Sequence, residues 1–179
     1  MRKSIWPVAA MAAALALGAG ATLASGEGGH AGGDKATAKK SEGQAKGLQK
    51  RALFAVLLGR NELDPETLHK GAGDLPGRGG ANVTIDGTTV CFGITVADLN
   101  ANPVAAHIHK GRRRQNGPIV VPLSPPATGD PGASSGCVQN VDADLANAIQ
   151  RHPKRYYVNV HTSTFPGGAV RGQLFGKRR

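Results

Sequence analysis

The chain has 179 residues, with 22 lysines and arginines against 12 aspartates and glutamates, which gives a formal net charge of +10. Such a charge favours anionic partners. The chain carries no recognisable nucleic-acid-binding motif and its first residues predict export, so nucleic acid is excluded as the expected partner.

Residues 1–24 have the pattern of a secretory signal peptide. Two basic residues precede an apolar run at 5–19, and small residues at 19–21 and 22–24 offer alternative cleavage sites. The run is too short to span a bilayer comfortably, and no later segment resembles a transmembrane helix. We therefore expect an exported protein without a membrane span, in the periplasm, at the cell surface or outside the cell.

Residues 25–50 are dominated by Gly, Ala and Lys and hold almost no large apolar side chain. Because such a segment cannot bury enough surface to offset the entropy of ordering, it is predicted to be a disordered linker. A basic tether for an acidic wall polymer is the alternative. Residues 51–176 then form one domain, followed by a basic tail at 177–179.

Short apolar segments separated by loops rich in Gly and Pro predict a β domain. Strands are expected at 53–58, 82–85, 89–96, 104–109, 119–123, 136–141, 156–162 and 169–175. The dipeptide Asp86-Gly87 predicts a type I′ turn between the second and third strands. One short helix is expected at 145–149, capped by Asp142 or Asp144. These elements indicate an antiparallel β-sandwich of the immunoglobulin-like, Greek-key style.

The two cysteines, Cys91 and Cys137, predict a disulfide. In an oxidising compartment an even pair within one domain is most simply a disulfide. Closing a loop of this length stabilises the fold by about 4 kcal/mol in the chain-entropy model. A two-cysteine metal site is the rival interpretation, but neither cysteine has a histidine or a second cysteine at ligand spacing.

Residues 132–136, GASSG, fit the G-x-S-x-G pattern of a hydrolase nucleophile. A nucleophile elbow needs a preceding strand and a following helix. This segment instead follows several prolines and leads into the strand of Cys137, so it is predicted to be a Gly/Ser loop. The sequence shows no convincing catalytic constellation and favours a non-enzymatic protein.

Two strands carry the candidate site. Successive side chains point to opposite faces, so His107 and His109 share one face, and Asn159 and His161 share a face of a later strand. The rings of His107 and His109 can converge on one ion, with His161 as third ligand. Imidazole ligands suit zinc, copper, nickel or iron, and of these copper or zinc is the expected cofactor. The alternative is a polar network in which these histidines hydrogen-bond one another, Asn159, Gln173 and backbone groups.

Arg171 and Gln173 extend the polar face. A hairpin register that pairs His161 with Arg171 would also pair Asn159 with Gln173. An arginine beside a bound cation is unfavourable, which weakens the metal hypothesis. The alternative partner of Arg171 is Glu62, in a structural ion pair.

Three consecutive arginines, Arg112, Arg113 and Arg114, follow the first histidine strand. A solvated surface loop is the ordinary interpretation. The functional interpretation is an anion-attracting rim beside the histidine face.

Several segments together resemble the CHRD (chordin) domain family. They are LGRNELDP at 58–65, AHIHKG at 106–111, NGPIVVPL at 116–123, YVNVHT at 157–162, PGG at 166–168 and RGQL at 171–174. The resemblance implies an all-β extracellular module. In chordin, related domains belong to a protein that binds secreted growth factors, a partner that does not carry over to a small single-domain chain. The HxH strand alone also resembles the copper-binding strand of copper/zinc superoxide dismutases, without a counterpart of their zinc loop.

The sequence thus supports two functions of different kinds. The first is a non-enzymatic exported module that binds or scaffolds an envelope or extracellular protein or an anionic polymer. The second is a module that binds copper or zinc through His107, His109 and His161, with redox activity as an option.

Overall fold

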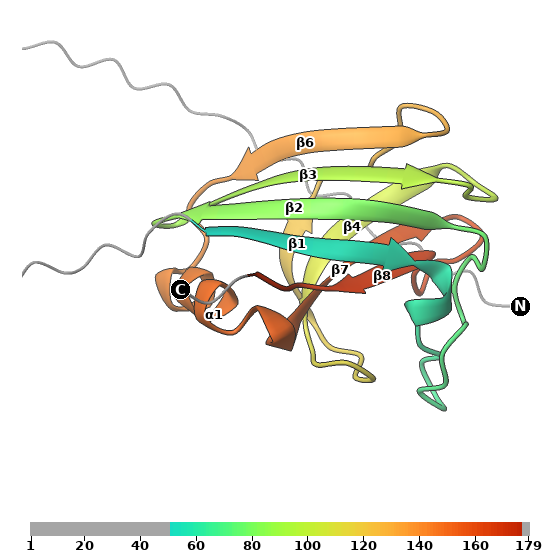
Figure 1. Cartoon of the computed structure of the whole chain (residues 1–179), viewed down its shortest axis with the longest axis horizontal. Coiled ribbons are helices and arrows are strands. Elements are labelled where there is room, and N and C mark those ends of the chain that lie inside the picture. Colours follow the sequence, from blue (N-terminus) through green and yellow to red (C-terminus); the bar gives the residue numbers. More distant parts are fainter. Residues whose placement is uncertain (1–50, 177–179) are drawn as a thin grey trace, which may run out of the picture. The chain divides into compact units, whose positions relative to one another are not determined.

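A single antiparallel sheet makes up most of the domain (Figure 1). The computed structural model describes residues 51–176, so the predicted signal peptide, linker and basic tail lie outside the described residues. The strands are β1 (Arg51–Leu58), β2 (Arg78–Asp86), β3 (Thr89–Ala97), β4 (Pro103–Lys110), β5 (Ile119–Leu123), β6 (Gly132–Val138), β7 (Tyr156–Thr162) and β8 (Val170–Gln173). Within these residues there is one α helix, α1 (Ala143–Arg151), and two 3-10 helices, η1 (Gly59–Asn61) and η2 (Pro153–Arg155).

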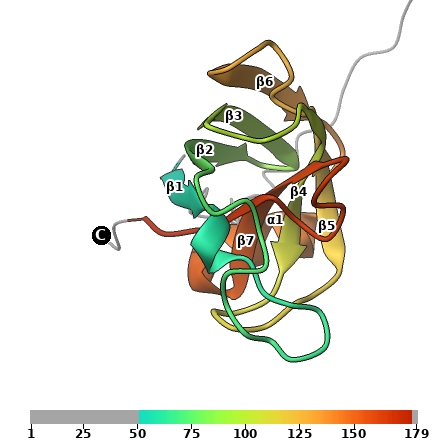
Figure 2. The same cartoon turned by 90° about the vertical axis from the view of Figure 1, so that its right-hand side faces the viewer.

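The sheet curls until its two end strands come close. Its order is β5-β4-β7-β8-β1-β2-β3-β6, and every neighbouring pair is antiparallel. The hydroxyl of Ser134 in β6 donates to the carbonyl oxygen of Ser124, just past β5, at 2.8 Å, and Figure 2 shows the strands wrapped around an interior. The antiparallel all-β prediction with one short helix is confirmed. The two separate sheets of a sandwich are not seen in residues 51–176, because one hydrogen-bonded ladder joins all eight strands into a nearly closed barrel.

Alternating apolar residues fill the interior of the barrel. In β1, β2 and β3 the inward residues are Leu53, Ala55, Leu57, Ala81, Val83, Ile85, Val90, Phe92, Ile94 and Val96. Burying each large side chain contributes about 1.5–3 kcal/mol. The helix α1 adds Ala146 and Ile149 to this core. Neither α1 nor any other described helix is long and apolar enough to cross a bilayer.

Of the two predicted helix caps, Asp142 is the one used. Its carboxylate accepts a hydrogen bond from the Leu145 amide at 2.8 Å. This contact satisfies one of the amide groups that the first turn of a helix leaves without a partner. The helix runs to Arg151, two residues further than expected at its C-terminal end.

Two details differ from the sequence-based expectation. Strand β6 occupies Gly132–Val138, so the GASSG segment lies in a strand rather than in a loop. Its small residues conceal the strand because β6 is the end strand and contributes few large side chains to the core. The turn between β2 and β3 consists of Gly87 and Thr88, since Asp86 already pairs with Thr89. Gly87 has a left-handed φ of 58° and Thr88 does not, so the expected type I′ turn is absent there.

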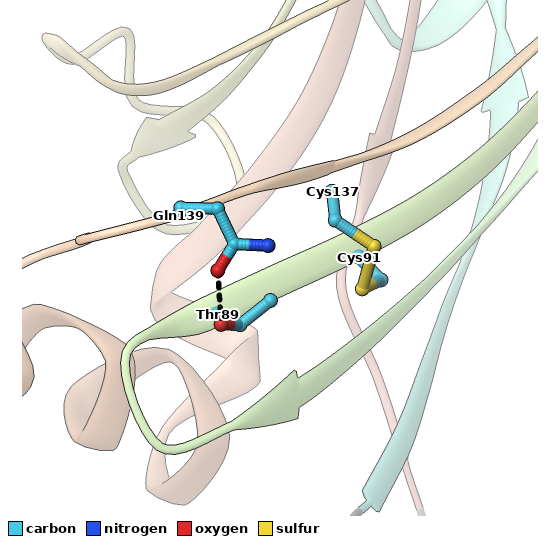
Figure 3. The surroundings of a disulfide bond; sticks show 4 residues. All are labelled: Thr89, Cys91, Cys137 and Gln139. Carbon is cyan, nitrogen blue, oxygen red and sulfur yellow. Dashed lines mark hydrogen bonds between the residues drawn. A yellow bond between two sulfur atoms is a disulfide. The ribbon is translucent and has the colours of Figure 1, made fainter.

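Cys91 and Cys137 form a disulfide on the outer surface of the sheet (Figure 3). They lie directly opposite each other in the β3–β6 ladder, while the adjacent Phe92 faces the core. Beside the bond, the Thr89 hydroxyl donates to Gln139 Oε1 at 2.7 Å. The disulfide therefore attaches the end strand to the barrel, and it indicates a compartment other than the cytoplasm.

Strand β7 is buried on both faces. The inward residues Tyr156, Val158 and Val160 belong to the core, whereas the outward residues Tyr157, Asn159 and His161 contact the loops that follow β1, β4 and β7. Loops therefore cover a polar layer on this part of the barrel surface. The candidate site lies in that layer.

Candidate metal centre

Three histidine rings gather on the outer face of β4 and β7. His107 and His109 come from β4, and His161 comes from the adjacent β7. The ring centroid of His107 lies 5.6 Å from that of His109 and 5.0 Å from that of His161. The centroids of His109 and His161 are 5.9 Å apart. One ring nitrogen of each histidine lies within 4.8 Å of a ring nitrogen of the other two. The structure therefore contains the predicted cluster.

Backbone carbonyls fix the orientation of two of these rings. His109 Nδ1 lies 2.9 Å from the carbonyl oxygen of Gly117, and His161 Nδ1 lies 3.0 Å from that of Pro166. Since a carbonyl oxygen only accepts, each Nδ1 carries a proton and donates it. In a neutral imidazole this leaves a lone pair on Nε2. Both rings therefore offer Nε2 as an acceptor.

The two Nε2 atoms have different surroundings. His161 Nε2 lies 3.1 Å from His107 Nδ1, so His107 donates to it when its Nδ1 carries the proton. His109 Nε2 is buried and has no hydrogen-bond partner among the described residues. A buried polar atom without a hydrogen-bond partner lowers the free energy of unfolding by about 1–3 kcal/mol. Hydrogen bonding within the cluster therefore leaves one lone pair unsatisfied.

Burial lowers the pKa of all three histidines. Desolvation is the main cause in each, and the charge of His161 adds to the lowering of the pKa of His107. The hydrogen bond to Gly117 partly opposes the lowering of the His109 pKa, and the bond to Pro166 does the same for His161. The rings are therefore neutral at neutral pH, which is the state that binds metal ions.

Tyr157 separates the histidine cluster from Arg171. Its ring stacks on His109, with centroids 4.8 Å apart and planes 9° apart. The guanidinium carbon of Arg171 lies 3.4 Å from the centroid of the same ring. His109 and Arg171 come from strands on opposite sides of β7, so they pack on opposite faces of Tyr157. The ring thus lies between the arginine charge and the histidines.

Arg171 is only 3% exposed, and several acceptors surround its charge. Nη1 donates to Asn116 Oδ1 at 2.8 Å and Nη2 to the Gln115 carbonyl at 2.6 Å. Nη1 also lies 3.8 Å from Glu62 Oε1, which confirms Glu62 as an ion-pair partner. Burial raises the pKa of Glu62, while the Leu63 amide and Arg171 oppose that rise. The loop acceptors lie closer to the guanidinium than the carboxylate does.

The register between β7 and β8 differs from the expected one. Asn159 pairs with Arg171, whereas the prediction paired His161 with Arg171. A shift of two residues keeps each side chain on its face, so the polar face is as predicted but its neighbours are not. Gln173 donates to backbone carbonyls, including that of Gly111 at 2.8 Å, rather than to a histidine.

The loop between β4 and β5, residues 111–118, contains Arg112, Arg113 and Arg114, and we call it the arginine loop. It contacts the histidines through its backbone. Gly117, whose carbonyl holds His109, passes so close to β4 that a Cβ atom there would collide with the Lys110 carbonyl oxygen. Only glycine permits this approach. The side chains of Arg112, Arg113 and Arg114 are exposed and line two cavities to which none of the three histidines contributes.

Sequence reasoning missed three residues of the site: Tyr157, Gly117 and Pro166. Tyr157 shares a strand face with Asn159 and His161, so the alternation that selected those two also selects it. The other two residues act through their carbonyl oxygens. The polar-network interpretation expected contacts to backbone groups, but no side-chain pattern indicates which carbonyls make them.

Comparison with protein families supports the resemblance noted in the sequence. The model of the CHRD domain matches residues 53–174, a range that holds the whole histidine cluster and both loops around it. Comparison with curated proteins and with solved structures finds no match. The chain therefore belongs to the CHRD domain family.

Proposed function

We propose that this domain acts as an exported module that binds copper or zinc through His107, His109 and His161. The observation that carries the proposal is the buried Nε2 lone pair of His109, which has no partner in residues 51–176. A cation in the cluster would give this lone pair a partner. It would also engage the Nε2 lone pair of His161, which the Pro166 carbonyl leaves available.

The surroundings of the rings support this proposal. In metal sites the ring nitrogen that does not bind the ion usually donates to a carbonyl or carboxylate, which fixes the tautomer. His109 and His161 already make such contacts. Bonds of about 2.0–2.1 Å place the nitrogens of a tetrahedral site about 3.3 Å apart. His107 Nδ1 and His161 Nε2 are 3.1 Å apart, and side-chain rotation covers the remaining separations, all within 4.8 Å.

Arg171 opposes a bound cation less than the sequence suggested. Its guanidinium packs on the face of Tyr157 that is turned away from His109. Its hydrogen bonds to Asn116 and Gln115, together with the Glu62 carboxylate, further offset its charge. The arginine is therefore compatible with a metal ion in the cluster.

Three neutral imidazoles leave at least one coordination position open. Open positions are typical of sites where the ion binds a small molecule or reacts, whereas structural zinc sites are usually closed by four protein ligands. A copper ion would supply one-electron chemistry, and a zinc ion would supply Lewis acidity. His107, the least buried of the three rings, gives solvent access to the cluster.

Metal binding by the untagged secreted chain tests the proposal. Elemental analysis should find one ion per chain, and calorimetric titration with Cu²⁺ and Zn²⁺ should give one dominant site. In the variant His107→Ala/His109→Ala/His161→Ala we expect affinity to fall more than about 100-fold, because loss of a mere supporting partner already costs 10–100-fold. The control His69→Ala/His152→Ala removes two exposed histidines and should bind as the wild type does. Equal affinity in both variants would contradict the proposal.

Export and association with an envelope or extracellular protein or polymer remain predictions from the sequence. Mass spectrometry of the secreted chain checks the first, since cleavage after residue 21 or 24 fixes the mature N-terminus. Retention of the full-length leader in a cytoplasmic fraction would contradict it.

A further inference from the structure

Two neighbouring cavities lie beside the arginine loop, and several basic side chains line each. The lining of the first, of about 350 Å³, includes Lys70, Arg113, Arg114 and Lys154. The lining of the second, of about 770 Å³, includes Arg112, Arg113, Arg151, Lys154 and Arg155. Arg113 and Lys154 line both, so the two cavities adjoin. We name the seven exposed basic residues the cationic groove: Lys70, Arg112, Arg113, Arg114, Arg151, Lys154 and Arg155.

No acidic residue that the structure describes neutralises the charge of the cationic groove. Among residues 51–176, no aspartate or glutamate lines either cavity. The ion pairs found in residues 51–176, Arg78 with Asp98 and Arg171 with Glu62, involve none of the seven residues. Like charges held together in hollows repel one another and concentrate a positive potential that attracts anions. An anionic ligand would relieve this repulsion.

Hydrogen bonds hold the two basic segments of the groove together. The Gln173 amide donates to the carbonyl of Gly111 at 2.8 Å and to that of Lys154 at 3.0 Å. The Gly111 amide donates to the Arg155 carbonyl at 2.8 Å. These bonds tie the loop after β4 to the segment before β7. Neither basic segment is therefore a loose surface tail.

Arg171 of β8 also holds the arginine loop in place. Arg171 Nη2 donates to the Gln115 carbonyl at 2.6 Å, and the Gln115 amide donates to the Arg112 carbonyl at 3.1 Å. Within this turn Arg114 adopts a left-handed φ of 61°, a conformation that costs an arginine free energy and suits glycine or asparagine better. The backbone that carries Arg112, Arg113 and Arg114 is thus fixed. A backbone held in place loses less entropy when a ligand binds.

We propose that the cationic groove binds an anionic polysaccharide that carries sulfate or phosphate groups. A polymer places several anions along the row of cations, and arginine forks match sulfate and phosphate geometry. Single-stranded nucleic acid is favoured by rows of aromatic side chains on which bases stack, but Phe175 is the one aromatic residue other than His152 that lines these cavities, and it packs against Phe54. A flat bilayer surface fits poorly because the cations line hollows.

Heparin, a sulfated polysaccharide, is the probe for this proposal. The full secreted chain is titrated with heparin at several NaCl concentrations, and wild type is compared with Arg113→Gln/Lys154→Gln, which removes the two residues shared by both cavities. Arg60→Gln/Arg78→Gln removes the same charge from exposed residues outside both cavities. We expect the first variant to bind about tenfold more weakly, with a salt dependence of log K reduced by about 2 in slope, and the control to bind as wild type does.

The outcomes distinguish the groove from overall charge and from the metal site. Equal losses in the two double variants, with equal melting temperatures, would overturn the proposal, because net charge alone would then explain binding. Tighter binding of oligothymidylate or of phosphatidylserine vesicles than of heparin would also overturn it, by assigning another class of partner. Heparin binding should persist with a chelator present and in the triple histidine variant, since none of the three histidines lines the groove.

Discussion

The two halves of the barrel use their outer surfaces differently. On β1, β2, β3 and β6 outward side chains reach the solvent, as with Val56, which is 56% exposed. On β7 and β8 outward side chains are polar and lie beneath loops, as with Asn159 at 2% exposed and Arg171 at 3%. Burying polar groups is unfavourable unless partners compensate. The second half therefore keeps an arrangement that folding alone does not require, and the histidine cluster lies there.

The largest expected effect comes from breaking the buried polar layer. Arg171→Met keeps an apolar stem but removes the guanidinium, which leaves Glu62 without its ion-pair partner and the acceptors Asn116 Oδ1 and the Gln115 carbonyl without this donor. Removing one partner of a buried ion pair costs about 3–5 kcal/mol. Urea denaturation measures this loss of unfolding free energy. Arg60→Met, at an exposed position, is the control, and a difference between the variants below about 1 kcal/mol would contradict the role assigned to Arg171.

Removal of the disulfide is expected to lower the free energy of unfolding without changing metal affinity. Cys91→Ala/Cys137→Ala releases β6 from β3, and loss of such a crosslink typically lowers the free energy of unfolding by about 2–4 kcal/mol. Copper and zinc affinities measured below the melting transition should match the wild type, because the bond joins β3 to β6 and none of the contacts described for the three histidines involves either strand. A parallel loss of metal affinity would show that the two halves are not independent.

Metal binding through the histidine cluster should stabilise the folded protein. A ligand at 100 times its dissociation constant stabilises the native state by about 2.7 kcal/mol, so copper or zinc should raise the melting temperature of the wild type. His109→Gln removes the ring whose Nε2 has no partner, and this variant should gain little from added metal. Scanning calorimetry with and without a chelator measures both. A full metal-dependent rise in the variant would rule out His109 as a ligand.

The smallest expected effect is a pH dependence of the metal-free protein. Burial lowers the pKa of His107, His109 and His161 in the folded state, so between about pH 6.5 and the lowered values the unfolded chain binds more protons. The free energy of unfolding should therefore fall as the pH drops below about 6.5. The raised pKa of Glu62 acts in the opposite sense, because its contribution is present at low pH and is lost as the pH rises through that pKa.

Urea denaturation from pH 7.5 downward measures this dependence. Glu62→Gln should steepen the loss of stability on acidification, and the triple His→Ala variant should flatten it. An unchanged slope in the triple variant would mean that the cluster does not titrate differently in the two states.

The first half of the barrel was the more predictable from sequence. In β2 and β3 every second residue is apolar, and this alternation locates the strands and their inward faces. The strand expected at 136–141 instead spans Gly132–Val138, and its first part was missed because glycine, alanine and serine give no such alternation at 132–136. Edge strands need fewer large side chains, so the physical signal is weak there.

In the second half, the sequence predicted which strand face each polar side chain lies on, but not which residues it contacts. Alternation placed His107, His109 and His161 on polar faces correctly. The pairing of Asn159 with Arg171 was not predictable, because shifting a register by two residues leaves every face unchanged. The position of Glu62 and of the two carbonyls that hold the histidines depends on how long loops fold over the sheet. Local sequence patterns carry no information on that.

The segment from Gly111 to Pro118 connects two neighbouring strands and serves two tasks with few residues. At one end of its span the Gly117 carbonyl orients His109, and within it Gln115 and Asn116 bind Arg171. Surface loops usually tolerate added residues at little thermodynamic cost. Here one inserted residue would prevent the connection from contacting His109 and Arg171 at the same time. The length of this connection is therefore constrained as much as its composition.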